Sequence, residues 1–383
     1  RTNRFRLSAN LMTERERLFQ HLVAMYQQGI VGVVATVVRV NGSHYRRAGV
    51  RMLLSSDGKR VGMISSGCVD LHGQAMEVME SRRPVVRRYD TTAHSDIVLG
   101  SRTGCQGVVD ILLAPIDDGQ TPPLHECLEQ PVLRGQSVVL ATVVGPNDLS
   151  NSSLRLGARL LLTANGDSNG YLGNAELQKA VEHDAEKILG SDQISANTYP
   201  CGKIGVEVLL EGLTPEKRLI LFGAGEDALP IVRIASEVGF DITVIDHRRA
   251  YADALRLPGA DAVLHTEDVL SAIQQINPDA KTAFVSVTHD YLRDVEILRH
   301  LALTQTIYVG VVGPRARADQ LIAASGWPDA EQHRLYCPAG LDIGAKTPEA
   351  IALSVVAEVQ AVLAARLGSH LRERSGPIHG PTT

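Results

Sequence analysis

Short apolar segments separated by glycine turns dominate the first half of the chain, and they recur in two copies. The sequence Ala-Thr-Val-Val at residues 35–38 returns at residues 141–144, each time as the apolar pattern of a buried strand. The glycines behind it recur with similar spacing, as Gly49, Gly58 and Gly62 and then as Gly157, Gly166 and Gly170. Each copy continues as a hairpin, a short strand, an amphipathic helix and a final apolar strand. We therefore expect a duplicated, β-rich α+β region over residues 12–213, with copies at about 30–115 and 136–213.

Apolar runs alternate with helical patterns in the second half of the chain, as a doubly wound parallel sheet requires. The runs that predict strands are residues 218–222, 241–245, 260–264, 282–287 and 306–312. Thr347 is placed as a helix N-cap and Pro348 as the first helical residue, and the apolar spacing behind them predicts a helix to about Leu367. We expect a C-terminal Rossmann-like α/β domain over residues 217–367 and a disordered polar tail at residues 368–383.

Composition and charge exclude several classes of protein. Hydrophobic residues make up 44% of the chain and charged residues 21%, as in an ordinary globular protein. Lys and Arg number 38 against 43 Asp and Glu, without a long basic block, so nucleic acid is not expected as a partner. No apolar stretch approaches the roughly 20 residues of a membrane span. The five cysteines are scattered without a C-x-x-C pair, which favours reduced thiols in a cytoplasm over a structural zinc site.

A glycine turn follows the first strand of the expected Rossmann domain. Its sequence at residues 223–225, Gly-Ala-Gly, precedes a helix, where backbone amides can approach a phosphate. Asp246 ends the second strand, where an acid can accept hydrogen bonds from a ribose. With the strand order 3-2-1-4-5, His289 at the end of the fourth strand lies beside the turn and can contact a ligand. The neighbouring acids Glu226 and Asp227 would repel a phosphate, and such glycines also serve turns that bind nothing.

Cys68 stands at or just before the expected start of a helix in the first copy. The positive end of the helix dipole and nearby arginines would favour its thiolate, which is a nucleophile and a ligand for soft metals. The second copy has Asn174 at the matching position, so the fold does not need sulfur there. The alternative is a small buried residue in a tight turn, and the same two interpretations apply to Cys105. Three arginines of the preceding hairpin either face an anion or are simply solvated: Arg46, Arg47 and Arg51.

Motifs in both halves of the chain resemble those of the XdhC/CoxI family. The N-terminal half carries Gly-Ser-His-Tyr-Arg-Arg-Ala-Gly-Val-Arg-Met at residues 42–52 and Gly-Met-Ile-Ser-Ser-Gly-Cys-Val-Asp at residues 62–70. The C-terminal half carries Gly-Ala-Gly at 223–225, Asp-His-Arg at 246–248, Thr-His-Asp at 288–290 and Gly-Val-Val-Gly at 310–313. The most specific stretch is Pro-Ala-Gly-Leu-Asp-Ile-Gly-Ala at 338–345, followed by Thr-Pro-Glu-Ala-Ile-Ala at 347–352. The matches span residues 18–366.

The resemblance implies an accessory chaperone rather than an enzyme. Such a protein binds the molybdenum cofactor, supports its sulfuration by a cysteine desulfurase, and delivers it to the apoenzyme of a xanthine dehydrogenase-type molybdenum hydroxylase. The cofactor is a pterin dithiolene that ends in phosphate, as molybdopterin, or in a nucleotide, as its cytosine dinucleotide. Its phosphate suits the glycine turn, and its molybdenum suits Cys68. We expect a homodimer whose cofactor-binding residues are Arg46, Gly67, Cys68, Asp70, Cys105, Gly223, Ala224, Gly225, Asp246, His289, Gly313 and Asp342.

Two other interpretations stay open. An NAD(P)-dependent oxidoreductase of xanthine, purine or aldehyde oxidation would use the same glycine turn, with Asp246 selecting NAD. Against it, the sequence has no convincing Tyr-x-x-x-Lys proton-relay pair, since Tyr251 and Tyr291 lack that spacing. No cysteine pattern for iron–sulfur clusters is present, so the chain is not itself a multi-centre hydroxylase. The third interpretation is an interaction scaffold with an empty nucleotide fold.

Overall fold

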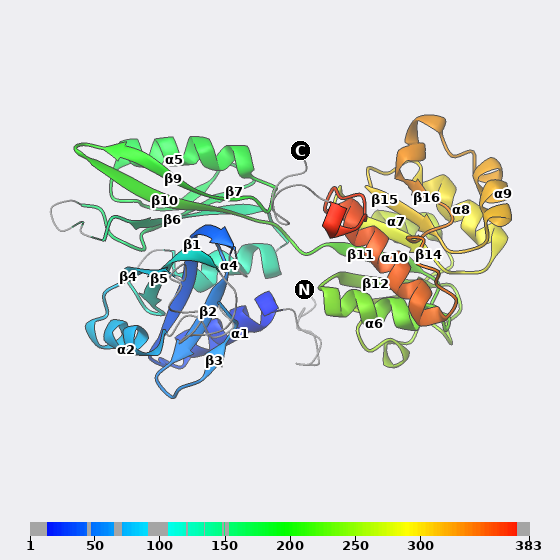
Figure 1. Ribbon diagram of the computed structural model, residues 1–383. Helices are drawn as coiled ribbons and strands as arrows, with labels where there is room; N and C mark the ends of the chain where they lie inside the picture. The colour runs from blue at the N-terminus through cyan, green and yellow to red at the C-terminus, as the bar shows by residue number, and fades with distance from the viewer. Residues whose placement is uncertain are drawn as a thin grey trace. The chain divides into compact units, whose positions relative to one another are not determined.

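The computed structural model describes residues 14–43, 47–64, 71–90, 106–119, 122–133, 135–147, 149 and 153–373. The chain forms two compact units, one over Glu14–Pro215 and one that begins at Glu216 (Figure 1). Five of the predicted cofactor-binding residues lie outside the described residues: Arg46, Gly67, Cys68, Asp70 and Cys105. Their roles therefore stay predictions from sequence.

The first unit repeats one sheet topology. In its described residues, one antiparallel sheet has the strand order β3-β2-β1-β5-β4 and a second has the order β8-β7-β6-β10-β9. The strands of the first sheet are β1 (Gly32–Ser43), β2 (Arg51–Ser55), β3 (Arg60–Val61), β4 (Val85–Asp90) and β5 (Gln106–Pro115). Those of the second are β6 (Val138–Gly145), β7 (Arg159–Thr163), β8 (Ser168–Gly170), β9 (Ile194–Cys201) and β10 (Ile204–Leu213). The edge strands β4 and β9 were not predicted, because many of their side chains are partly or fully exposed and give no buried-strand pattern.

Helices cover the sheets of the first unit at matching places in the chain. They are α1 (Glu14–Gln27), α2 (His72–Ser81), α4 (Leu124–Leu133) and α5 (Ala175–Ile188). The side chain of Asn174 caps α5 by accepting hydrogen bonds from the amides of Glu176 and Leu177, both at 2.9 Å. Asn174 therefore satisfies helix amides in the second copy, which explains why that copy needs no sulfur there.

Alternate side chains of β1 face two different cores. Val33 and Val37 pack against α2, whereas Val34 and Val38 point the other way and pack against residues of the second sheet. This is the two-residue period of a strand with both faces buried. The two sheets of the first unit therefore pack face to face through the even-numbered side chains of β1.

Two buried ion pairs lie between these sheets. Arg51 Nη2 contacts Glu211 Oε2 at 2.6 Å, and the two side chains are only 9% and 1% exposed. Arg159, which begins β7 as Arg51 begins β2, binds both carboxylate oxygens of Asp118. The interpretation that Arg51 faces an anionic ligand is wrong, because its charge is used to neutralise the buried Glu211.

The second unit is built on a parallel sheet with the order β13-β12-β11-β14-β15-β16 over residues 216–373. Its strands are β11 (Arg218–Phe222), β12 (Asp241–Asp246), β13 (Ala262–His265), β14 (Thr282–Ser286), β15 (Tyr308–Val311) and β16 (Leu335–Tyr336). The predicted fold class is confirmed, and the first five strands have the predicted order. The sixth strand was not predicted, since two residues carry no periodic signal.

Helices cover both faces of the parallel sheet, as Figure 1 shows. The core of one face contains residues of α6 (Ala228–Val238) and α10 (Pro348–Leu363). The core of the other contains residues of α7 (Val269–Ile276), α8 (Tyr291–Leu301) and α9 (Arg315–Ser325). Helix α10 begins as predicted, with Thr347 accepting a hydrogen bond from the Ala350 amide. It ends at Leu363 and not near Leu367, because Ala365 turns into the left-handed region at φ +51°.

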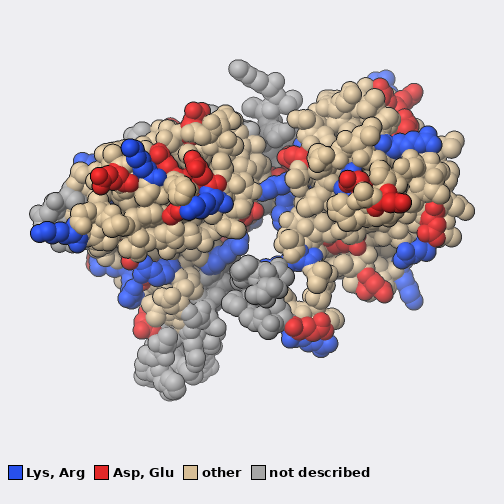
Figure 2. All heavy atoms as spheres, turned by 90° about the horizontal axis from the view of Figure 1, so that it is seen from above, with Lys and Arg blue, Asp and Glu red and all other residues tan. Residues whose placement is uncertain are grey.

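Within the predicted tail, Leu371–Glu373 form a short 3₁₀ turn, and residues 374–383 lie outside the described residues. Among the described residues, no helix has the length and apolar character to cross a membrane. On the face seen in Figure 2, acidic and basic side chains are intermixed over each unit. This intermixing agrees with the low net charge of the sequence.

Candidate functional site

The carboxyl ends of the parallel strands bring most of the other predicted residues to one edge of the second unit. Gly223, Ala224 and Gly225 follow β11, Asp246 ends β12, His289 follows β14 and Gly313 follows β15. The strand order reverses between β11 and β14, where open α/β sheets bind their ligands. Asp342 lies in the loop between β16 and α10, and its side chain is exposed.

The glycine turn is shaped by its contact with the end of β14. Gly223 has φ +107°, and a Cβ there would stand 2.7 Å from the carbonyl oxygen of Val287. Only glycine therefore fits at this position. Gly225 differs, because a Cβ there would meet nothing within 4 Å. The turn thus has a closed side against β14 and an open side at Gly225, where a ligand can approach the backbone.

Each of the two acids at the start of α6 has a hydrogen-bonding partner. Glu226 Oε1 lies 2.8 Å from Arg256 Nη2, and Asp227 Oδ2 lies 2.8 Å from His289 Nε2. His289 reaches Asp227 from a strained backbone with φ +55°, which is uncommon for a residue other than glycine. These pairs reduce the repulsion that Glu226 and Asp227 would exert on a phosphate at the glycine turn.

Asp246 is buried, and its carboxylate is saturated with hydrogen bonds. One oxygen accepts from the Ala224 amide and from Arg248 Nη2, each at 2.7 Å. The other accepts from the Arg248 amide at 2.7 Å and from Arg248 Nε at 3.0 Å. A carboxylate offers about four lone-pair sites, so these four donors fill it. In this structure Asp246 anchors the glycine turn and Arg248, and it has no free acceptor for a ribose.

These hydrogen bonds predict an acid dependence of stability. Burial alone raises the pKa of Asp246, but the hydrogen bonds from Arg248 and the Ala224 amide outweigh it and lower the pKa to about 2, from an ordinary value of 3.8. A lowered pKa means that the ionised carboxylate stabilises the fold above about pH 4. This contribution, about 2 kcal/mol, is lost as the pH falls towards 2.

Between pH 5 and pH 2, we expect the free energy of unfolding of the second unit to fall by about 2 kcal/mol more in the wild-type chain than in the Asp246→Asn variant. Urea unfolding followed by the fluorescence of Trp327 measures this directly, because Trp327 is the only tryptophan of the chain and lies in this unit. Equal losses in the two proteins would contradict the assigned role of Asp246.

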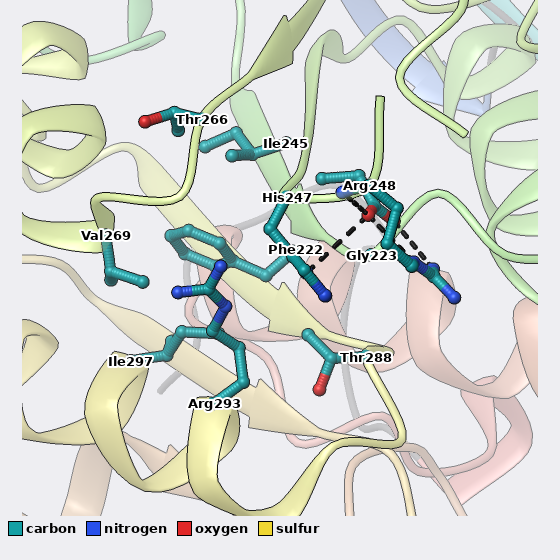
Figure 3. A pocket seen from close by; sticks show the side chains of 11 residues that line it. Phe222, Gly223, Ile245, His247, Arg248, Thr266, Val269, Thr288, Arg293 and Ile297 are labelled. Atoms are coloured by element: carbon teal, nitrogen blue, oxygen red, sulfur yellow. Dashed lines mark hydrogen bonds and ion pairs between the residues drawn. The ribbon is translucent and has the colours of Figure 1, made fainter. Parts of the chain in front are cut away.

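A pocket opens beside the glycine turn, on the sheet face covered by α7 and α8 (Figure 3). It is a small depression that is partly open to solvent. Four apolar side chains line it: Phe222, Ile245, Val269 and Ile297. His247, Thr288 and Arg293 bring polar groups to the same space, and Gly223 and Arg248 border it. Apolar walls with a few convergent polar groups are typical of sites for small organic ligands.

A buried network fixes the polar group of Thr288 in this pocket. Its Oγ1 donates to Asp294 Oδ1 at 2.6 Å, and Ser286 Oγ donates to the same oxygen at 2.5 Å. Arg317 Nη2 lies 2.6 Å from the other oxygen of Asp294, whose side chain is 1% exposed. Because Asp294 is held from three sides, Thr288 has little freedom to turn away from the pocket.

Sequence reasoning missed the polar residues of this pocket. His247, Arg248 and Thr288 were seen only as parts of motifs, and Arg293 not at all. Three of them share a signal of position, since His247, Arg248 and Thr288 follow the carboxyl end of β12 or β14 by one or two residues, whereas Arg293 lies in the first turn of α8. Conversely, the pocket lining does not include Ala224, Gly225, His289, Gly313 and Asp342.

The described cysteines are poor candidates for a reactive thiol. Burial raises the pKa of Cys127 to about 12 and that of Cys337 to about 11. Both are therefore protonated at neutral pH. Cys201 is half-buried at the end of β9. No group of three or more metal-ligating side chains occurs in the described part of the chain.

Comparison with protein families decides the assignment. The model described as the XdhC Rossmann domain matches residues 219–359. The model described as the XdhC and CoxI family matches residues 25–90 and 132–199, one segment in each copy of the repeated sheet. A curated protein of Bacillus subtilis, named as a probable subunit of xanthine dehydrogenase, is 30% identical over 88% of this chain and 95% of its own length.

The chain belongs to the XdhC/CoxI family. The resemblance inferred from the motifs is thereby confirmed. Another relative, named "Molybdenum cofactor insertion chaperone PaoD" in Escherichia coli, is 24% identical over 92% of this chain and 90% of its own. A crystal structure from Bacillus halodurans, described as a xanthine dehydrogenase, superposes with a TM-score of 0.73 at 28% identity. It covers 93% of this chain and 97% of the solved one, so the XdhC/CoxI architecture extends through both units.

Proposed function

We propose that this XdhC/CoxI protein is a maturation chaperone that binds the molybdenum cofactor and delivers it to the apoenzyme of a xanthine dehydrogenase-type molybdenum hydroxylase. The observation that carries the proposal is the glycine turn of the second unit. It is open at Gly225, and both neighbouring acids are held by hydrogen-bonding partners. The names of two relatives support the same cargo, since one is named for xanthine dehydrogenase and the other as a molybdenum cofactor insertion chaperone.

The residues present fit the phosphate end of this cargo. Gly223, Ala224 and Gly225 offer backbone without side-chain bulk, and a Cβ at Gly225 would occupy space that is now empty. His289 Nε2 holds the carboxylate of Asp227 by a hydrogen bond of 2.8 Å. In the proposal Gly313 and Asp342 border the cargo from the following loops. Asp246 acts through the Ala224 amide and Arg248 as a positioning residue.

The molybdenum end of the cargo is assigned to the first unit on sequence grounds. Cys68 would contact molybdenum, with Arg46, Gly67, Asp70 and Cys105 around the cofactor. The raised pKa values of Cys127 and Cys337 support this assignment, because they leave these two thiols without thiolate character. The proposal includes sulfuration of the bound cofactor with a cysteine desulfurase as sulfur donor, and a homodimer as the working form.

The alternative of an NAD-dependent oxidoreductase is less well supported. It requires Asp246 to accept hydrogen bonds from the ribose of NAD. The four donors on Asp246 oppose that role, since a ribose hydroxyl would have to displace one of them.

Transfer to an acceptor enzyme tests the proposal. The chain is loaded with cofactor without oxygen, freed of excess ligand and mixed in air with a molybdenum hydroxylase purified without its cofactor. We expect several-fold more hydroxylase activity than an equal amount of free cofactor gives. The variant Gly225→Val, whose side chain fills the open side of the turn, should deliver less cofactor and so give less hydroxylase activity than the wild-type chain. Equal activation by free and by bound cofactor would contradict the chaperone function.

A further inference from the structure

The second unit does not hold a nucleotide in the way its Asp246 motif suggests. An acid at the end of the second strand of a Rossmann sheet normally accepts hydrogen bonds from the hydroxyls of a ribose. Here Arg248 supplies three of the four hydrogen bonds on that acid, through its amide, Nε and Nη2. Asp246 is only 2% exposed. The carboxylate of Asp246 is therefore not available to a ligand, and the side chain of Arg248 lies between it and solvent.

Arg248 is held rigidly in this position. Its guanidinium carbon lies 3.9 Å from the centre of the Tyr251 ring, and that of Arg256 lies 4.7 Å from the same ring. With Nε and Nη2 fixed on Asp246, the third guanidinium nitrogen, Nη1, has no hydrogen-bond partner within the described part of the chain. The side chain is 39% exposed. An ordered arginine with one free donor is well suited to bind an anion.

His247 and Arg293 bring further N–H groups to the pocket, whereas the hydroxyl of Thr288 already donates to Asp294. Figure 3 shows His247 on the side of β12, with Thr288 and Arg293 on the side of α8. His247 Nδ1 lies 3.7 Å from Asp246 Oδ1, which leaves its Nε2 directed away from that acid. Arg293 is 16% exposed, and its Nη1 contacts the Glu267 carbonyl oxygen at 2.7 Å and Glu296 Oε2 at 3.2 Å. Asp246, the acid that lines this pocket, is already neutralised by Arg248.

We propose that the pocket of the second unit recognises its ligand by a phosphate monoester, bound by Arg248 together with His247, and not by a ribose diol bound by Asp246. This deepens the proposed function, because it specifies the chemical group by which the Rossmann domain selects its ligand. A monoester phosphate carries close to two negative charges at neutral pH and suits a site where an arginine and a second N–H donor converge. A nucleotide with a free ribose diol would find no free carboxylate oxygen to accept its hydrogen bonds. It would also carry no negative charge for Arg248 to bind.

A matched pair of probes isolates this group. NADP⁺ and NAD⁺ differ only by a phosphate monoester on the ribose hydroxyl that Asp246 would otherwise bind. We expect calorimetric titration of the full chain to show NADP⁺ binding at least tenfold more tightly than NAD⁺. In Arg248→Ala the preference should fall to about one, because the phosphate loses its partner and Asp246 is released. Arg248→Gln provides a second variant with less loss of packing on Tyr251.

Arg249→Ala is the matched control. It removes the same charge from the adjacent position, but Arg249 does not line the pocket, so the tenfold preference should persist. Equal affinities of the wild-type chain for the two probes would overturn the proposal. So would failure of both to bind at millimolar concentration, or an equal loss of preference in Arg248→Ala and Arg249→Ala, which would reveal only general electrostatic attraction.

Competition identifies the natural source of the monoester. Molybdopterin ends in a phosphate monoester, whereas in its cytosine dinucleotide that phosphate is part of a pyrophosphate bridge to the nucleotide. Displacement of NADP⁺ by molybdopterin would assign the site to the cargo itself, and simultaneous binding would assign it to a separate nucleotide. The inference and the proposed function fail separately. A chain that delivers cofactor but does not prefer NADP⁺ refutes only the inference, and the reverse result refutes only the chaperone.

Discussion

Replacing Arg51 with methionine is expected to destabilise the first unit by about 3–5 kcal/mol. The variant leaves the Glu211 carboxylate, 1% exposed, without its cation between two packed sheets. Water cannot reach it to replace the lost ion pair, so the desolvation cost of the charge is no longer offset. Urea unfolding followed by far-UV circular dichroism should show an early transition of the first unit. The unfolding transition of the second unit, followed by Trp327 fluorescence, should keep its wild-type midpoint in urea.

The double variant Arg51→Met/Glu211→Leu separates charge from packing. Removing both partners takes away the uncompensated charge, so we expect most of the lost stability to return. Lys59→Met is the surface control, because Lys59 and Asp57 form an exposed pair 3.2 Å apart. It should change stability by less than about 1 kcal/mol. A loss below about 1 kcal/mol in Arg51→Met would show that the pair contributes little to joining the sheets.

Cys68→Ala is expected to remove most of the molybdenum that the chain retains after anaerobic loading and gel filtration. The reason is chemical, since a thiolate is a strong ligand for a soft metal centre and alanine offers no donor. Cys201→Ala is the control, because Cys201 lies at the end of β9 in the other copy of the repeat and has no proposed role. Molybdenum per chain, measured by mass spectrometry of the metal, should fall at least fivefold in the first variant and stay unchanged in the second. Equal retention in both variants would assign Cys68 to packing.

The parallel sheet could be predicted from sequence because its strands are fully buried. Residues such as those of β11 and β14 form continuous apolar runs, and the glycine turn marks where the first run ends. The strands that escaped prediction are the short β16 and the edge strands β4 and β9, whose side chains are partly exposed. Strands are predicted from the pattern of apolar residues, and this pattern arises from burial. A strand with few buried side chains is therefore hard to predict.

For the candidate site, the sequence predicted which side chains stand at the strand ends but not their partners. The end of β12 was correctly expected to carry an acid, and the neighbouring strand ends to carry glycines and a histidine. The sequence could not show that Arg248 saturates Asp246, or that His289 pairs with Asp227, 62 positions away. Arg51 and Glu211 are 160 positions apart and meet only because two sheets pack together. Such partners depend on the tertiary fold, and local motifs do not contain them.

Binding of the molybdenum cofactor by this chain is tested most directly by the stoichiometry of the complex. Purified chain is mixed without oxygen with excess free cofactor, and separately with NAD⁺, and each mixture is passed through gel filtration. We expect about one molybdenum per chain to co-elute with the protein, and no stoichiometric NAD⁺. Co-elution of NAD⁺ without molybdenum would contradict the chaperone function and favour a dehydrogenase.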